Sequence, residues 1–180
     1  MATTKDLSEL IDREMGKGQG PFLVRICQDA GLLPKVKRGG WRSMEQLTPE
    51  QLADFVIAIA GTRAVGKRNA NGARAAVERF AGLVNVRSGR KTVRDTLAAL
   101  LRNGTPNDVV MSWVLFVNHP DAPEVEVRQH KGKTDTGIAQ EFNDPSNDSP
   151  DGVAEASVIY GGLIEALHDL VVIKREDTAT

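Results

Sequence analysis

The stretch LAALLRNGTPNDVVMSWVLFVN, residues 97 to 118, contains the change of hydrophobic period that decides the fold. Up to Leu101 the apolar residues recur at the three- and four-residue spacing of a helix, and Gly104 marks the end of that helix. From Met111 onward, apolar and β-branched residues form a run that is typical of a strand. A helical part therefore precedes residue 104, and a β-rich part follows it.

Short helices are expected upstream of this change. The second of them places Phe22 and Cys27 on its apolar face, and the glycine-rich residues 16–20 are the expected turn before it. The third has the clearest start, because Thr48 is a good N-cap and Gln51 completes a capping box. Apolar residues follow helical spacing within residues 3–15, 21–30, 47–60, 73–80 and 93–101.

Downstream, residues 111–130 contain two β-rich runs around a proline-containing turn, and valines alternate with charged residues at 124–128. Further runs predict a strand at 136–142, a strand at 154–160 and a closing helix at 163–172. We therefore expect an α+β fold, with an N-terminal helical winged helix-turn-helix bundle followed by a small C-terminal antiparallel β-sheet plus helix.

The charges divide at the same place. Residues 1–103 hold 18 Lys and Arg against 10 Asp and Glu, a net charge of +8, whereas residues 104–180 hold 5 against 14, a net charge of −9. This asymmetry predicts a basic, polyanion-binding domain at 1–103 and an acidic α/β accessory domain at 104–180 for dimerisation or for partner or ligand binding. The alternative is a chance segregation of solvated surface charge.

Several classes of protein are not indicated. The single cysteine, Cys27, excludes an internal disulfide framework, and the histidines and cysteine do not have the spacing of metal ligands. No nucleophile motif is present, so we expect a protein that is not an enzyme and that uses no metal and no cofactor. The sequence lacks a secretion leader and an apolar run of roughly 20 residues, and this predicts a cytoplasmic protein with no membrane partner.

The most informative basic segment is AGLLPKVKRGGWR, residues 30–42. It lies between the helix expected at 21–30 and the helix that begins at Thr48, which is the order of recognition helix, wing and following helix in a winged helix-turn-helix. Gly39 and Gly40 would allow a tight turn at the tip of the wing. The side chains expected to contact bases or phosphates are Arg25, Gln28, Lys35, Lys37, Arg38, Trp41 and Arg42.

This segment resembles the DNA-binding head of the MerR family of transcription regulators over about residues 7–57. The resemblance implies that Arg25 and Arg42 contact the DNA backbone and that Trp41 packs at the base of the wing. The two residues after Arg25 differ from the family, which has tyrosines there. The family's pattern is matched by Arg25, by GLLP at 31–34, by GWR at 40–42 and by TPEQL at 48–52.

Two further basic segments are candidate phosphate contacts. GTRAVGKR, residues 61–68, fits the spacing of a nucleotide-binding P-loop, but Arg68 stands where that loop needs Ser or Thr, and the preceding run is predicted to be helical. RSGRKTVR, residues 87–94, leads into a helix capped by Thr92 and Asp95. Solvated turns are the alternative for both segments. The candidate additional phosphate contacts are Arg63, Lys67, Arg68, Lys91 and Arg94.

Together these features predict a sequence-selective protein that binds double-stranded DNA, a transcriptional regulator of a bacterium or phage that acts as a homodimer. The C-terminal domain is a candidate site for a protein or small-molecule partner. One alternative is a DNA-recognising assembly protein, such as a viral small terminase subunit. Another is a nucleotide-dependent enzyme built on residues 61–68. In a third, the acidic half is the functional part and serves as a protein-interaction module or as a mimic of nucleic-acid charge.

Overall fold

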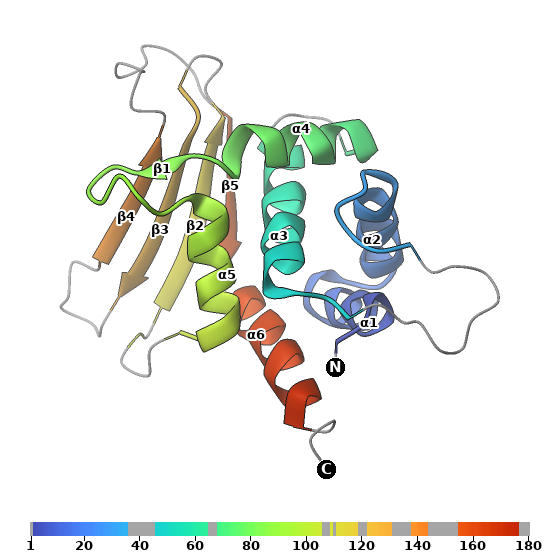
Figure 1. The fold of residues 1–180 in the computed structure, drawn as a ribbon. Helices are drawn as coiled ribbons and strands as arrows, with labels where there is room; N and C mark the ends of the chain where they lie inside the picture. The colour runs from blue at the N-terminus through green and yellow to red at the C-terminus, as the bar shows by residue number, and fades with distance from the viewer. Residues whose placement is uncertain are drawn as a thin grey trace.

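The computed structural model describes residues 2–35, 46–64, 68–105, 109, 111–118, 122–130, 138–143 and 155–176. In this part of the chain, helices come first, and an antiparallel sheet and a C-terminal helix follow (Figure 1), so the predicted α+β class is confirmed. The helices are α1 (Thr4–Met15), α2 (Gln19–Asp29), α3 (Pro49–Ala64), α4 (Ala70–Phe80), α5 (Val93–Asn103) and α6 (Gly161–Glu176). The strands are β1 (Val84–Asn85), β2 (Met111–Asn118), β3 (Glu124–His130), β4 (Ile138–Asn143) and β5 (Glu155–Tyr160).

Threonine caps define where three of these helices begin. At α3, the Thr48 N–H donates to Gln51 Oε1 at 2.9 Å, and the Gln51 N–H donates to Thr48 Oγ1 at 3.2 Å. Thr92 and Asp95 make the same reciprocal pair at α5. Both predicted caps are therefore confirmed, and a further capping box, which was not predicted, begins α1 at Thr3. Each box satisfies backbone N–H groups that the first turn of a helix leaves without partners.

Helix α3 is the centre of the molecule. Its side chains Leu52, Phe55, Val56, Ile57 and Ile59 are all buried, which is the pattern of a helix enclosed on every side. It packs against α4 and α5 and against strands β5 and β2. The sheet consequently lies on one side of α3, and the pair α1 and α2 lies on the other side (Figure 1).

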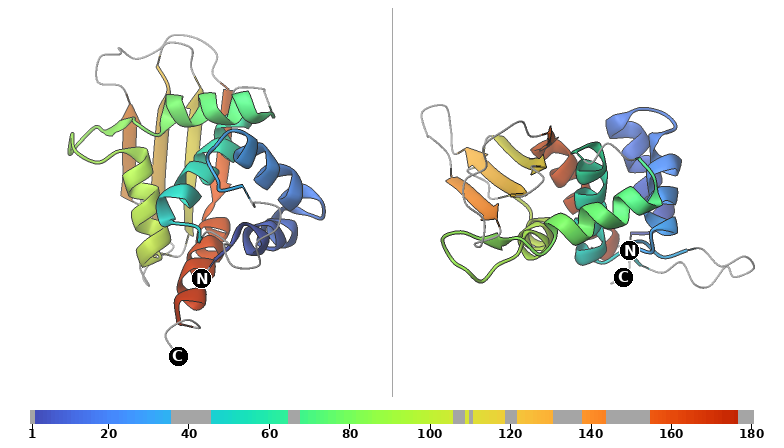
Figure 2. Two further views of the ribbon diagram at one scale, coloured as in Figure 1. Left: turned by 45° about the vertical axis from the view of Figure 1, so that its right-hand side comes forward. Right: turned by 90° about the horizontal axis from the view of Figure 1, so that it is seen from above.

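The strands form one antiparallel sheet in the order β1-β4-β3-β2-β5. Along β3, Val125 and Val127 are buried, and Glu124 and Glu126 lie on the opposite face, which confirms the predicted alternation. Helices α3, α5 and α6 all lie on the inner side of the sheet (Figure 2). The other face of the sheet has no helix against it among the described residues.

The core connects the helices to the sheet. Phe116 of β2 meets Phe80 of α4 edge to face, with ring centroids 5.5 Å apart and ring planes at 85°. One cluster of buried apolar side chains continues from α1 through α3 and α5 to the sheet and α6. The boundary between residues 1–103 and 104–180 stays a prediction, and the described core crosses it.

Candidate nucleic-acid interface

Helices α1 and α2 are joined by a short turn and pack against each other. The connection is the three-residue turn 16–18, and both of its glycines have positive φ, +106° and +89°. The turn was predicted at 16–20, and it is shorter because α2 already begins at Gln19. Directly after it, the Gly20 N–H donates to Asp12 Oδ1 at 2.6 Å. A β-carbon at Gly20 would lie 1.9 Å from the Ser8 carbonyl oxygen, so only glycine lets the two helices approach this closely. A short glycine-containing turn between two packed helices occurs in αα-hairpins and in the helix-turn-helix of DNA-binding proteins.

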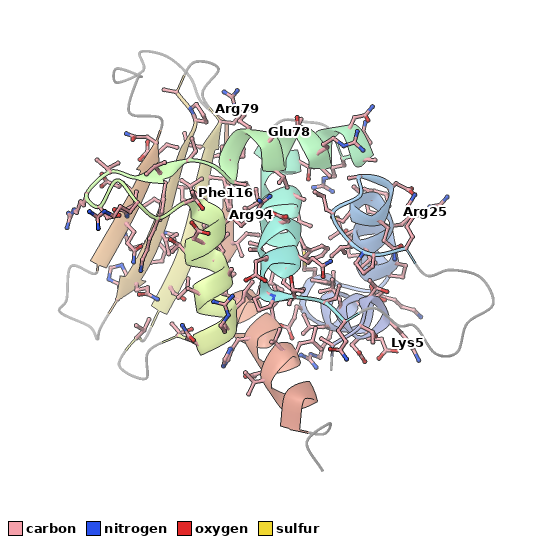
Figure 3. All side chains as sticks on the ribbon, viewed as in Figure 1. Lys5, Arg25, Glu78, Arg79, Arg94 and Phe116 are labelled. Atoms are coloured by element: carbon pink, nitrogen blue, oxygen red, sulfur yellow. The ribbon has the colours of Figure 1, made fainter. Side chains whose placement is uncertain are left out.

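One face of α2 is turned away from the core. Leu23, Val24 and Cys27 are buried where α2 packs against α1, α4 and α3. The Arg25 side chain keeps 84% of its surface exposed and points outward (Figure 3). Phe22 is 46% exposed, so its predicted place on the apolar face is wrong. The buried stripe follows positions 23, 24 and 27, and one step of about 100° places Phe22 outside it.

Asp29 lies between two of the predicted DNA-contacting cations. Its Oδ2 is 3.8 Å from Arg25 Nε, and its Oδ1 is 3.2 Å from Lys35 Nζ. All three side chains are at least half exposed, so these ion pairs orient the cations without adding much stability. The three groups together carry one net positive charge. The prediction from sequence did not include Asp29, although its i,i+4 spacing from Arg25 was a readable signal.

The C-terminal end of α2 is held by side chains. The Gln28 amide Nε2 donates to the Pro34 carbonyl at 2.9 Å, which ties the segment after the helix back to α2. From α4, Arg74 Nη2 donates to the Ala30 carbonyl at 3.2 Å. The Gln28 side chain thus positions the entry to the basic segment, and its contact with bases stays a prediction.

Part of the predicted site lies outside the described residues. Lys35 is exposed and Arg68 is exposed, and both belong to the part that the structure describes. Residues 36–45, which include most of the predicted wing, are outside it. The predicted residues concerned are Lys37, Arg38, Trp41, Arg42 and Lys67, together with the side chain of Arg63.

The P-loop pattern at 61–68 begins inside a helix. Helix α3 continues through Ala64, so the run before the pattern is helical, as predicted, and the strand that a P-loop follows is not there. Gly61 has a packing role instead. A β-carbon at this position would lie 2.5 Å from the Ala76 β-carbon and 3.2 Å from the Phe80 ring, so the glycine permits the close contact between α3 and α4.

Arg94 forms a long-range ion pair in the structure. Its Nε donates to Asp54 Oδ1 of α3 at 2.6 Å, and Figure 3 shows Arg94 directed from α5 toward α3. The Asp54 side chain is only 16% exposed, and its burial raises the pKa of this carboxyl, while the hydrogen bond and charge of Arg94 oppose the rise. Arg94 therefore neutralises a buried acid, and its predicted phosphate contact stays a prediction.

The start of α5 already holds a carboxylate. Asp95 accepts hydrogen bonds from the Thr92 N–H and side chain, and these bonds lower the pKa of Asp95. Because this carboxylate occupies the first turn, the helix end has less capacity for an outside anion. The neighbouring Lys91 is exposed, so a phosphate contact there would come from the lysine side chain itself.

Acidic side chains gather on the outer face of the sheet. Glu126 of β3 stands opposite Glu141 of β4 in the register. Partial burial raises the pKa of Glu124, and the neighbouring charges of Glu141 and Glu126 raise it further. The sheet lies across α3 from α2 (Figure 1), so this acidic face and the exposed face of α2 belong to different sides of the molecule.

Among the residues that the structure describes, no group of three or more His, Cys, Asp or Glu side chains could hold a metal ion. None of the described helices is both long enough and apolar enough to span a membrane. No protein-family model matches the chain, no curated protein matches it, and no solved structure matches it.

Proposed function

We propose that this protein binds double-stranded DNA with sequence selectivity and acts as a transcriptional regulator. The observation that carries the proposal is the exposed face of α2, with Arg25 extending from it, in a helix pair α1–α2 that we interpret as a helix-turn-helix. The second helix of such a pair is the one that enters the major groove, and its N-terminal residues reach the base edges. Arg25 is the seventh of the eleven residues of α2 and lies in its second turn.

The exposed side chains of α2 have the chemistry of base recognition. An arginine can donate two hydrogen bonds to guanine O6 and N7, and an apolar ring such as that of Phe22 can contact the methyl group of thymine. Lys35 follows the end of α2 and suits a phosphate contact, which positions a protein on DNA without reading sequence. The pattern shared with the MerR head, including the basic residues 35–42, supports the same assignment.

Binding to duplex DNA across a salt series tests the proposal. If roughly six phosphates are contacted, log affinity falls against log salt with a slope of about −5. The double variant Arg38→Ala, Arg42→Ala is expected to flatten this slope by about two units. Arg25→Ala is expected to lower affinity for a selected sequence more than affinity for random DNA. A flat salt response, or no binding below about 0.1 mM at low salt, would refute the proposal.

Mass measurement in solution separates the proposed regulator from the assembly-protein alternative. Paired half-sites favour a homodimer, whereas a packaging-motor subunit forms a ring. The nucleotide-enzyme alternative predicts ATP or GTP binding that is lost in Lys67→Ala, so a chain with no measurable nucleotide affinity would remove it.

A further inference from the structure

A hairpin at residues 84–92, here called the basic hairpin, projects from the β1 edge of the sheet (Figure 1). An antiparallel bridge joins its first and last residues, and the Asn85 N–H donates to the Lys91 carbonyl at 2.9 Å. At the turn, Gly89 has φ +60°, and its N–H donates to the Asn85 carbonyl at 2.8 Å. The backbone of this loop is therefore held in one conformation by its own hydrogen bonds.

Side-chain and sheet contacts hold the hairpin further. The Asn85 Oδ1 accepts from the N–H of Arg87 at 3.1 Å and from the N–H of Ser88 at 2.9 Å. The Val86 N–H donates to the Glu141 carbonyl of β4 at 2.9 Å, which fastens the hairpin to the sheet. A cationic loop that is ordered before binding loses less conformational entropy when it contacts a ligand.

The cations of the basic hairpin differ from most others in the basic half. Arg87, Arg90 and Lys91 are exposed, and among the described residues no ion pair joins them to a carboxylate. Elsewhere in the described part of residues 1–103, the ion pairs are Lys5 with Glu9, Arg13 with Glu14, Arg25 and Lys35 with Asp29, Arg94 with Asp54, and Arg102 with Glu50. The hairpin thus concentrates three exposed positive charges that form no ion pair with a described carboxylate.

We propose that the basic hairpin binds the phosphodiester backbone of DNA, as a second contact that is independent of sequence. This inference rests on the proposed function and adds a surface that α2 does not provide. The hairpin and α2 lie at opposite ends of the molecule in Figure 1 and in both views of Figure 2. Arg87, Arg90 and Lys91 therefore add phosphate contacts, while the α2 face reads bases.

The test compares two triple variants in a salt series with random-sequence duplex DNA. The hairpin variant is Arg87→Ala, Arg90→Ala, Lys91→Ala, which leaves Asn85 and Gly89 in place. The control is the triple variant Lys5→Ala, Arg13→Ala, Arg102→Ala, which removes the same charge from cations that are already paired. At about 0.9 units for each phosphate contact, the hairpin variant is expected to flatten the salt slope by up to roughly 2.7 units, and the control by much less.

A second measurement uses the unaltered chain, so it does not depend on the folding of a variant. Acetylation of lysine amines by an N-hydroxysuccinimide ester, followed by mass spectrometry, compares Lys91 with Lys5 in the presence and absence of random duplex. The basic hairpin predicts strong protection of Lys91 by DNA and little protection of Lys5, which is exposed on α1. Equal modification of Lys91 with and without DNA would overturn the inference.

The outcomes separate this inference from the proposed function. If the unaltered chain binds DNA and the hairpin and control variants lose equal affinity, only net charge matters and the hairpin inference fails, while the α2 proposal stands. If the hairpin variant loses affinity and Arg25→Ala does not lower affinity for a selected sequence, the hairpin inference is supported and the proposal that α2 reads bases is refuted. If the hairpin variant changes the oligomeric mass without changing DNA affinity, the hairpin contacts another copy of the chain, and the inference is overturned.

Discussion

The Nε of Arg94 lies 2.6 Å from Oδ1 of Asp54, which joins the first turn of α5 to the central helix α3. The Asp54 carboxylate is more buried than the Arg94 guanidinium, so removal of either partner has a different effect on stability. We predict that Arg94→Ala destabilises the protein by about 1–3 kcal/mol near pH 7, because it leaves a buried charge without its partner. Asp54→Asn leaves no buried charge and is expected to cost less.

The pH dependence of the same pair provides the control. Because the folded-state pKa of Asp54 is raised, this group's contribution to stability falls as pH rises from the unfolded pKa through the folded one. Loss of Arg94 is expected to raise the folded-state pKa of Asp54 further, and this widens the pH range over which the contribution of Asp54 to stability falls. Chemical unfolding should show the stability deficit of Arg94→Ala shrinking between about pH 7 and about pH 4, because the carboxyl of Asp54 takes up a proton as pH falls. An equal loss of stability in Arg94→Ala at about pH 7 and at about pH 4 would show that the charge of the Asp54 carboxylate is not the cause.

Asp29 is expected to weaken DNA binding. Its carboxylate sits between Arg25 and Lys35 on the proposed binding face, where it repels phosphates and competes for both cations. Asp29→Asn removes one negative charge and should tighten binding to random duplex by about two- to tenfold at low salt. Glu78→Gln, an exposed change of the same kind on α4, is the matched control. Fluorescence anisotropy measures both, and a similar gain in the two variants would contradict a local role for Asp29.

The Cys27 thiol is expected to be inert in the folded protein. Burial raises the pKa of Cys27 to about 12, and the negative charge of Asp54 adds to the rise. The thiol is therefore protonated and inaccessible at about pH 8, and its reaction with a disulfide reagent should be at least roughly a hundredfold slower than that of the urea-unfolded chain. Fast reaction of the folded protein would place Cys27 at the surface instead of between α2 and the core.

Gly104 controls the contact between α5 and α6. Its φ is +75°, and a β-carbon there would lie 2.8 Å from Nε2 of His168, whose Nδ1 is 3.0 Å from the Leu101 carbonyl oxygen. Gly104→Ala is expected to lower the free energy of unfolding by about 1–3 kcal/mol, through backbone strain and displacement of the imidazole. Gly82→Ala, with open space around it, is the control and should stay within about 0.5 kcal/mol. Thermal unfolding of the two variants distinguishes these effects.

Local features of the sequence were sufficient to predict most of the helices and strands of the fold. The Thr48 and Thr92 caps, the glycine-rich turn after α1 and the alternation along β3 act over a few residues, so their patterns predict the elements directly. The two-residue strand β1 was not predicted, because its pairing with β4 joins segments far apart in the chain. The predicted orientation of Phe22 was also wrong, because the packing of α2 against α1, α3 and α4 decides which side of α2 is buried.

The sequence by itself determined the α+β order, the opposite charges of the two halves and the basic character of the segment after α2. Only the tertiary structure decided which cations meet carboxylates. Arg94 is paired with an acid 40 positions away, whereas Arg87, Arg90 and Lys91 form no ion pair with a described carboxylate. The physical reason is that net charge is a sum over residues, but the binding capacity of each cation depends on its neighbours in space.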